Sequence, residues 1–564
     1  MKKIRWQLII IFITGLVVGI LLLSDTTTGP IQIFESQPTS GGTYIEGTVG
    51  TMQRLNPLLS YYNNTDQDIC RLIYSGLVRF DNRGLPQADL AREWGISMDG
   101  KIYNFAINPD ARWHDGQPVT SDDVVFTYEM IKQASGYLPE DLLTFWAGIT
   151  IRPIDPKTVQ FELPDAYAPF ISYLNIGILP KHIWANMSFQ EMVNSKVNIQ
   201  PVGSGPYKLG TLKLEGSNIT GIDLVRNGEF YRENAFLEEI QIRFYPDSTR
   251  AYQAYEQGLV DGISYVGSDI LYSVLAQENL SLYTARLPII TMILLNNAND
   301  NVDFFKNADI RKALLAGINR TSIVNDLFKG QAIIAHGPIL PGNWAYYDGI
   351  PKIEFDSYKS IEILKSAGYV LANEQDQVRS KDGKTLNFTM LYPDDDVHRS
   401  VAEAVQQNLA AVNVLVNLEA VSPDELINVR LAERNYEAAL IDLNLSRIPD
   451  PDPYPFWDQT QISSGQNYSQ WNNRIISQYL ETARVETDLD ERERLYRNFQ
   501  VLFADEMPSL PLFTPVYNFA INSKIKGISV GPLYTSSDRF QTVESWYLIS
   551  RPGISENATA IPKK

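Results

Sequence analysis

Two places in the sequence hold residue types that could support hydrolytic chemistry. His114 and Asp115 are adjacent in the segment Trp-His-Asp-Gly-Gln-Pro, and Ser204 lies between two glycines. A catalytic histidine needs a carboxylate that orients its ring, but adjacent residues on a strand or turn point in different directions. We therefore predict that Asp115 and Gly116 form a turn, that His114 is structural, and that the glycines beside Ser204 belong to a strand crossing or hinge.

Motifs typical of hydrolases and phosphate-binding enzymes are missing from the sequence. It contains no Gly-x-Ser-x-Gly elbow, no His-Glu-x-x-His and no phosphate-binding loop. Adjacent acids such as Asp122 and Asp123 are frequent, but a chain with 66 acidic residues produces such pairs by chance, mostly on its solvated surface. We predict that the protein is not an enzyme, and a secreted hydrolase is the less favoured alternative.

Residues that ligate metals are scarce and scattered. Cys70 is the only cysteine, which excludes an intramolecular disulfide and a cysteine-based zinc or iron–sulfur site. The four histidines are far apart in the sequence: His114, His182, His336 and His398. The sequence predicts no metal site and no cofactor, and it predicts that Cys70, in an apolar stretch, is a small buried side chain.

The charge and length of the chain limit its partners and its architecture. It carries 48 basic and 66 acidic residues, a formal net charge of −18. Such a surface repels phosphate backbones, and no basic run opposes it, so we expect no nucleic-acid partner. A chain of 564 residues also exceeds the size of a single hydrophobic core, which predicts two or more lobes.

The N-terminus has the pattern of a secretory signal or a signal anchor. Lys2, Lys3 and Arg5 precede an apolar run from Leu8 to Leu23, and neither a small-x-small cleavage site nor a cysteine for lipid attachment follows. We predict that residues 1–24 are an uncleaved signal anchor that tethers an extracytoplasmic body to the cell membrane, in the periplasmic space or at the cell surface. Cleavage stays open because the run is short.

Hydrophobic periodicity beyond this segment predicts an α/β chain. Period-two alternation indicates strands at 42–49, 101–107, 385–391 and 414–420. Helical spacing indicates helices at 66–77, 310–318 and 400–412, one that Ser121 caps, and one that begins after Val421. Residues 25–42, rich in Thr, Ser, Pro and Gly, are predicted to be a linker, and 551–564 a disordered tail.

An ordered set of segments resembles one family. The longest is Ala111–Tyr128, and the others follow in the order 55–57, 73–81, 90–94, 97–105, 178–182, 202–208, 257–261, 309–314, 318–320, 367–369 and 450–454. The set is similar to the solute-binding proteins of peptide and nickel ABC importers, extracellular family 5, over about residues 43–548.

The resemblance implies a two-lobed clamshell like the periplasmic binding proteins, with an inserted subdomain in lobe I. Lobe I would combine residues 43–75, 202–285 and 510–550, the inserted subdomain would be 76–201, and lobe II would be 286–509. Such a fold closes over a solute by hinge motion, and the solute stabilises closure only by contacting both lobes.

The resemblance also implies the function. The protein would be the extracytoplasmic solute-binding component of an ABC import system, a monomer that captures oligopeptide-like solutes and delivers them to a membrane permease and its ATPase subunits. A nickel-chelate or other small-solute binder of the same fold is the alternative, because a metal held inside a chelator needs no histidine cluster.

Side chains in three loops are the candidate ligand contacts. Tyr61, Tyr62 and Asn63 follow the Leu-Asn-Pro segment in a loop that faces the cleft in the resembled fold, and Trp344 lies in a second family loop. In the third, residues 443–457, four prolines forbid a helix and give a rigid backbone. It supplies the remaining candidates, Arg447, Asp450, Tyr454 and Trp457.

Arg447 departs from the pattern of the peptide-binding relatives. In these relatives an aspartate three positions before an Asp-Pro pair holds the amino terminus of the ligand, and aligning that pair on Asp450-Pro451 places Arg447 there. A guanidinium repels an ammonium and attracts a carboxylate or phosphate. We therefore expect that Asp450 or Asp452 binds the amine, that the ligand has the opposite polarity, or that it is not a free peptide. A structural Arg447 is the remaining alternative.

Overall fold

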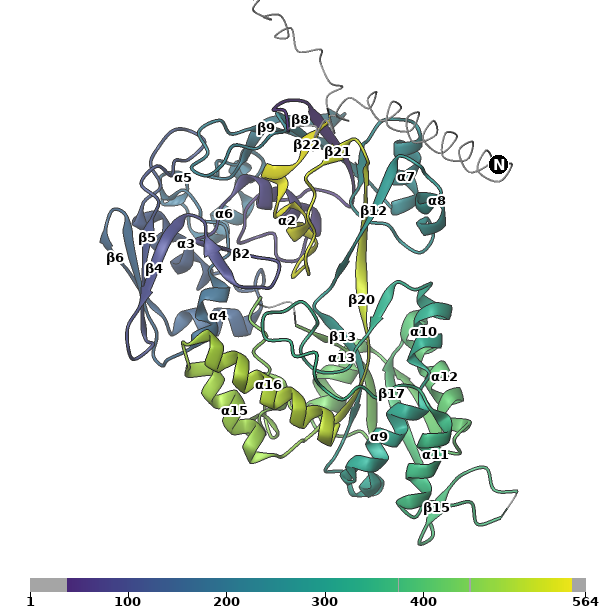
Figure 1. The fold of residues 1–564 in the computed structure, drawn as a ribbon. Helices are drawn as coiled ribbons and strands as arrows, with labels where there is room; N and C mark the ends of the chain where they lie inside the picture. Colours follow the sequence, from purple (N-terminus) through teal and green to yellow (C-terminus); the bar gives the residue numbers. More distant parts are fainter. Residues whose placement is uncertain (1–37, 374, 446–447, 550–564) are drawn as a thin grey trace, which may run out of the picture. The chain divides into compact units, whose positions relative to one another are not determined.

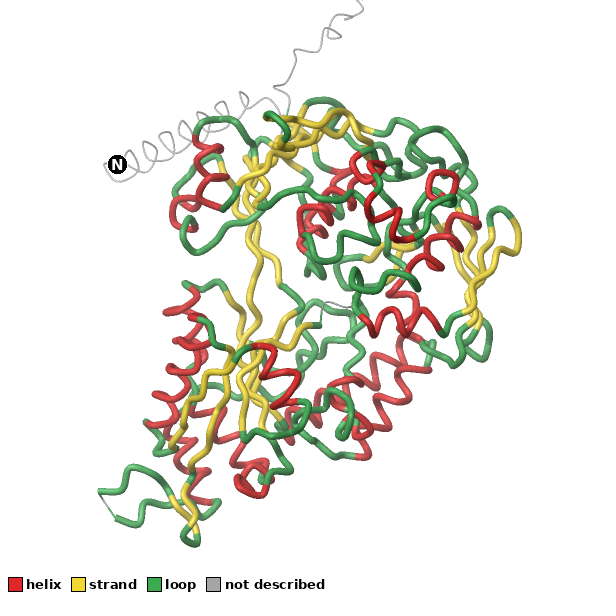
Figure 2. Tube along the Cα trace, turned by 180° about the vertical axis from the view of Figure 1, so that it is seen from behind, coloured by secondary structure: helices red, strands yellow, loops and turns green. Residues whose placement is uncertain are grey.

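The longest strand, β20 (Ser509–Asn522), is buried along nearly its whole length. Most of its residues are apolar, because neighbouring elements cover the strand. Its first half pairs with β13 (Ile289–Leu295) and β14 (Ala332–Ile334), and its second half pairs with β12 (Leu280–Arg286) and β11 (Gly262–Ile263), all antiparallel. One strand therefore serves two groups of elements, as Figures 1 and 2 show.

This computed structural model describes residues 38–373, 375–445 and 448–549, of which Ser40–Leu548 form one compact unit. Ten strands of the central twelve-stranded sheet follow the order β18-β17-β19-β13-β20-β11-β1-β10-β9-β8, and β12 and β14 also pair with β20. The remaining bounds are β1 (Thr43–Val49), β8 (Tyr207–Glu215), β9 (Asn218–Arg226), β10 (Glu239–Tyr245), β17 (Asn387–Pro393), β18 (Leu415–Val421) and β19 (Ala438–Asn444).

We call the group around β1, β8–β12 and the second half of β20 lobe I, and the group around β13, β14, β17–β19 and the first half of β20 lobe II. The chain passes between them at β12–β13 and within β20. The predicted two-lobed α/β fold is confirmed. The residue ranges predicted for its domains stay a prediction.

Lobe II has a helical layer on each face of its sheet. Alternate residues of β13 point to opposite faces: Ile293 and Leu295 belong to one apolar cluster, and Met292 and Leu294 to the other. The helices of the first layer are α9 (Ala308–Gly317), α10 (Arg320–Phe328), α11 (Ser357–Ser366) and α12 (Asp396–Ala410). Those of the second are α15 (Arg474–Val485) and α16 (Leu489–Glu506).

Shorter elements complete lobe II and lobe I. In lobe II they are the hairpin β15 (Ser380–Lys381) and β16 (Lys384–Thr385), α13 (Pro423–Glu425) with a π-helical turn at Leu426–Leu431, and α14 (Tyr454–Trp457). In lobe I they are α2 (Asn64–Ile73), α7 (Ser248–Glu256), α8 (Leu271–Leu275), β21 (Ile525–Lys526) and β22 (Tyr547–Leu548). The prediction that the prolines forbid a helix in 443–457 is wrong at α14, because Pro455 lies in its first turn, where a missing N–H is tolerated.

The inserted subdomain has its own antiparallel sheet, in the order β4-β5-β7-β6. Its strands are β4 (Ala91–Ile96), β5 (Ile102–Ile107), β6 (Thr150–Asp155) and β7 (Thr158–Glu162), preceded by the hairpin β2 (Val78–Phe80) and β3 (Pro86–Ala88). Its helices are α3 (Ser121–Ile131), α4 (Glu140–Ala147), α5 (Lys181–Trp184), α6 (Phe189–Asn194) and the 3₁₀ helix η1 (Ala168–Tyr173).

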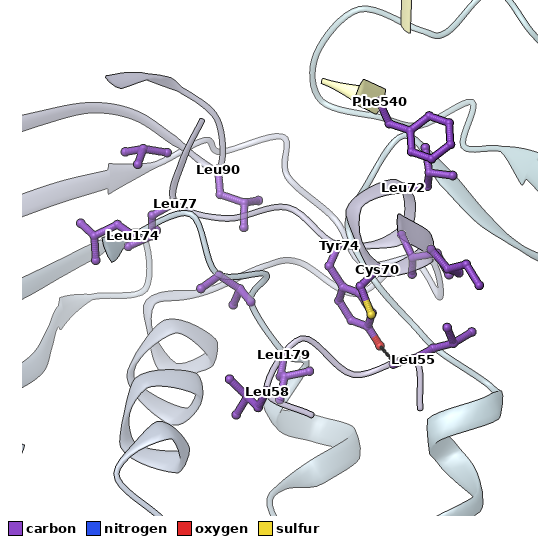
Figure 3. Close-up of a cluster of buried hydrophobic side chains, with 14 of the residues drawn as sticks. Leu55, Leu58, Cys70, Leu72, Tyr74, Leu77, Leu90, Leu174, Leu179 and Phe540 are labelled. Atoms are coloured by element: carbon purple, nitrogen blue, oxygen red, sulfur yellow. Dashed lines mark hydrogen bonds between the residues drawn. The ribbon is translucent and has the colours of Figure 1, made fainter. Parts of the chain in front are cut away.

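A shared core joins this subdomain to lobe I. Figure 3 shows Leu72 of α2 beside Phe540 and Cys70 of the same helix beside Tyr74, and Leu90 and Leu174 of the subdomain belong to the same cluster. Cys70 is buried, as predicted, and burial raises the pKa of its thiol well above its usual value. Continuous apolar packing makes the two parts one folded body.

Two predicted helix ends differ from the structure. The helix predicted to reach residue 77 ends at Ile73, because the carbonyl of Ile73 accepts a hydrogen bond from the amide of Gly205 at 2.8 Å and Tyr74 turns extended. The cap of α3 is Thr120, which forms a capping box with Asp123, and not Ser121, whose hydroxyl donates to the carbonyl of Asp155 at 2.5 Å.

The predicted signal anchor (1–24) and most of the predicted linker (25–42), together with the predicted tail (551–564), lie outside the described residues. Within the described ranges, no helix has the length and apolar composition needed to cross a membrane.

Candidate ligand-binding site

A cavity of about 310 Å³ lies between the inserted subdomain and lobe II. One wall is formed by Asp141 and Phe145 of α4, by Tyr167 at the N-cap of η1 and by Tyr173 at the end of η1. The opposite wall comes from Asn444, Leu445, Ile448, Asp450, Pro451, Asp452, Pro455, Phe456 and Arg484. The volume is at the lower end of the range for small-molecule sites, about 300–1,000 Å³.

Two further cavities adjoin the first through shared wall residues. One of about 350 Å³ shares Phe145, Tyr167 and Arg484 with it. The other, of about 40 Å³, shares Leu445, Ile448 and the Asp450-Pro451 pair. The three cavities therefore follow the proline-rich segment, and both lobes contribute to their walls.

Stacked aromatic rings hold the subdomain wall in place. The rings of Phe145 and Tyr173 are stacked with centroids 4.3 Å apart and an interplanar angle of 28°, and Tyr167 meets Phe145 edge to face at 5.7 Å. Such pairs add to the energy of apolar burial and fix ring orientation. This wall therefore offers aromatic surface to the cavity.

The buried ion pair between Asp450 and Arg492 fixes the proline-rich segment on α16. The two side chains are 6% and 7% exposed, and Arg492 nitrogens lie 2.8 and 3.0 Å from the two Asp450 oxygens. Arg492 also donates to the carbonyl of Ala483 at 2.9 Å, and its guanidinium lies 5.0 Å from the ring centroid of Trp344. The Asp450 carboxylate is thus already neutralised by a protein cation.

Asp452 connects the two walls of the cavity. Its Oδ2 accepts a hydrogen bond from the hydroxyl of Tyr167 at 3.1 Å and lies 3.1 Å from Nη2 of Arg484. The guanidinium of Arg484 also covers the rings of Tyr167 and Tyr454, at 5.0 and 4.1 Å from their centroids. These contacts form a polar link between the inserted subdomain and lobe II.

The second oxygen of Asp452 lacks a hydrogen-bond donor among the described residues. Oδ1 is buried and has no hydrogen-bond partner among residues 38–373, 375–445 and 448–549. Burial raises the pKa of the Asp452 carboxyl, although the neighbouring Arg484 acts in the opposite direction. A buried acceptor without a donor is costly, so a ligand that supplied an N–H group here would gain free energy.

The structure gathers only some of the side chains predicted from the sequence. Asp450 and Tyr454 line the cavities. Trp344 and Trp457 are each 3% exposed and pack in the core of lobe II. Tyr61 and Tyr62 are 39% and 70% exposed in the turn before α2, whose N-cap is Asn63. Arg447 lies outside the described residues, and the roles of these eight side chains in binding stay predictions.

Phe145, Tyr167 and Arg484 are among the wall residues that could not be predicted from the sequence. Each occupies an ordinary position in its own element, and 285 residues separate Tyr167 from Asp452. No local motif marks such a contact, because only the packing of the subdomain on lobe II brings the two side chains together. Alignment with relatives of known site geometry is the signal that could have found them.

His114 is structural, as predicted. Its Nδ1 accepts a hydrogen bond from the amide of Gly203 at 3.2 Å, and its Nε2 lies 3.1 Å from the carbonyl of Gly205. Burial lowers the pKa of His114 to about 4. Asp115 instead contacts His182 at 2.8 Å, and Ser204 is fully buried. His114 and Asp115 therefore do not form a catalytic pair.

No group of three or more His, Cys, Asp or Glu side chains that could hold a metal occurs in the part of the chain that the structure describes.

The family model of bacterial extracellular solute-binding proteins, family 5 (middle region), matches residues 86–466. The oligopeptide-binding protein AppA of Bacillus subtilis is 26% identical over 523 residues, which cover 91% of this chain and 92% of AppA. The family predicted from the ordered segments is confirmed.

Solved structures of relatives share the fold. AppA of Bacillus subtilis in complex with a nonapeptide matches with a TM-score of 0.63 at 24% identity, over 91% of this chain and 100% of AppA. HbpA2 of Haemophilus parasuis matches with a TM-score of 0.78 at 20% identity, over 90% and 100%. NikZ of Campylobacter jejuni in complex with Ni(L-His) matches with a TM-score of 0.63 at 25% identity, over 90% and 99%.

Proposed function

Because the chain belongs to the bacterial extracellular solute-binding proteins of family 5, we propose that it is the extracytoplasmic binding component of an ABC importer for oligopeptide-like solutes. It captures solute between its lobes as a monomer, and hinge closure gives the form that the permease and ATPase subunits recognise. The observation that carries this proposal is the cavity of about 310 Å³ whose walls come from both the inserted subdomain and lobe II.

The chemistry of these walls suits an extended peptide. Aromatic surfaces of Phe145 and Tyr167 accept side chains of many sizes, and the unsatisfied Oδ1 of Asp452 can accept a hydrogen bond from a backbone N–H or an amino terminus. Asp450 is less suited to that role because Arg492 already pairs with it. A ligand that touches both walls stabilises the closed form by its contacts with each.

Calorimetric titration of the purified protein with pools of tri- to pentapeptides tests the proposal. We expect binding without cleavage of the peptides, an increase in melting temperature, and a smaller radius of gyration by X-ray scattering when peptide is added. The Phe145→Ala variant removes the ring that lines two cavities and should weaken peptide binding at least about 10-fold.

The matched control is Tyr358→Ala on α11, whose ring is 86% exposed and lines none of the three cavities. This variant should bind peptides as the wild type does. New peptide fragments would instead indicate a hydrolase. A nickel–histidine chelate that bound while every peptide pool failed would establish the alternative, which the similarity to NikZ supports.

We extend the proposal to the attachment of the protein. Three basic residues before the apolar run Leu8–Leu23 support an uncleaved membrane anchor with the binding body outside. The full-length protein should stay with membranes after carbonate extraction, and a variant that lacks residues 1–24 should not. A mature protein that began beyond residue 24 would show that the segment is a cleaved signal.

A further inference from the structure

Arg286 stands at the crossing between the lobes with an unused guanidinium. It is the last residue of β12, pairs with Val516 of β20, and precedes the Leu287-Pro288 connection to β13. Its side chain is partly buried, yet it makes no hydrogen bond or ion pair with any residue in 38–373, 375–445 or 448–549. Burial lowers the pKa of the guanidinium, which reports the lost hydration.

Arg311, Arg320 and Arg539 are more deeply buried than Arg286, and each of them has several partners within the described chain. Arg311 donates to the carbonyls of Glu506 and Met507, and Arg320 donates to those of Ala335 and Pro511. Arg539 pairs with Asp68 at 2.6 Å. A guanidinium has five N–H donors, and leaving them without partners in a partly buried position costs free energy. Arg286 differs from these arginines because the described residues supply no partner for its donors, which suggests a partner that is not part of the chain.

The small cavity that Arg286 lines is otherwise apolar. Leu287, Ile339, Leu340, Leu445 and prolines 288, 338, 341, 449, 451 and 532 form most of its wall. Besides Tyr534, its other polar members are already engaged: Asn343 donates to the carbonyl of Pro449 at 3.1 Å, and Asp450 pairs with Arg492. The guanidinium is therefore the available charge in this cavity.

The local backbone makes room for the guanidinium. Gly342 has a φ of +88°, and a Cβ atom at this position would lie 2.7 Å from Nη2 of Arg286. A side chain here would push the guanidinium away, so the glycine keeps it against the loop. The volume of about 40 Å³ admits a small end group and not a whole peptide.

We propose that Arg286 is the subsite for a carboxylate of the bound solute, which the guanidinium holds at the crossing of the lobes through paired N–H···O bonds. The inference rests on the proposed function, and it specifies the orientation of the ligand, with its carboxylate at Arg286. The small cavity shares Leu445 and Ile448 with the large one, so a solute can occupy both. Because its wall combines Arg286 and Pro532 with the 338–343 loop of lobe II, a carboxylate there contacts elements on both sides of the crossing.

The test compares three peptide pools on the wild type and on Arg286→Gln by calorimetry. The pools are tri- to pentapeptides with a free C-terminus, the same peptides amidated, and amidated peptides that carry one Asp. We expect amidation to weaken binding to the wild type about 10- to 100-fold, and Arg286→Gln to lose the same factor for free acids only. If the amidated peptides that carry Asp bind the wild type as tightly as the free acids do, the subsite takes a side-chain carboxylate.

A melting measurement on Arg286→Gln and one more variant, Gly342→Ala, separate the subsite from a fault in folding. Without ligand, Arg286→Gln should melt at or above the wild-type temperature, since it removes a charge that has no partner. Gly342→Ala should weaken free acids and leave amidated peptides unchanged. Equal binding of acids and amides by the wild type would overturn the carboxylate subsite while the proposed function stood. Failure of every pool to bind would overturn both.

Discussion

The buried Asp450–Arg492 pair, which fixes the proline-rich segment (443–457) on α16, gives a measurable prediction for the stability of lobe II. Replacing Arg492 by Met keeps most of the side-chain volume but leaves the Asp450 carboxylate buried, 6% exposed, without its cation. Removing one partner of a buried pair costs about 3–5 kcal/mol, because the remaining charge loses both water and its counterion. The carbonyl of Ala483 also loses a donor. We expect a loss within that range in the free energy of unfolding of lobe II.

The assay is urea unfolding followed by tryptophan fluorescence, with a double-mutant cycle. Asp450→Asn combined with Arg492→Met removes both charges, so the double variant should recover at least about 2 kcal/mol relative to the sum of the single losses. Arg494→Met on the same helix is the control, because Arg494 is exposed and pairs with Glu491 at the surface; its midpoint should equal that of the wild type.

If Arg492→Met unfolds at the same urea concentration as Arg494→Met, the buried pair does not stabilise lobe II. If the double variant loses the sum of the two single-variant losses, the charges of Asp450 and Arg492 do not interact. A large loss would also predict weaker peptide binding, because Asp450 and Arg492 hold the segment that lines all three cavities.

The remaining predictions concern His114 and Gly203. Burial lowers the pKa of His114 from 6.5 to about 4, so the stabilisation from the neutral ring is complete above pH 6.5 and is lost as the pH falls toward 4. The free energy of unfolding should fall by up to about 3 kcal/mol over that range. In His114→Gln the free energy of unfolding should depend less steeply on pH. A wild-type slope in His114→Gln would contradict this. A Cβ on Gly203 would lie 1.9 Å from the carbonyl oxygen of Ile73, so Gly203→Ala should lower stability by about 1–3 kcal/mol in thermal or urea unfolding. Gly228→Ala, where a Cβ meets nothing within 4 Å, is the control, and equal stability of the two variants would exclude the clash.

Much of the fold was predictable because its signals are local. Alternation at β1 and β5, the acids at the start of α3 and the buried position of Cys70 each depend on a few neighbouring residues. Errors arose where a distant segment intervened. The helix α2 stops at Ile73 because Gly205, far along the chain, donates to its carbonyl.

The candidate site was less predictable from the sequence. Composition and motif order determined the family, the α/β class and the importance of the proline-rich segment, since backbone stiffness and chain order are properties of the sequence itself. Only the tertiary structure decided that Tyr167 meets Asp452, that Arg492 neutralises Asp450, and that Arg286 has no partner among the residues that the structure describes. These facts depend on which side chains remain unsatisfied after the lobes pack, and hydrogen bonding between distant segments leaves no spacing pattern in the sequence.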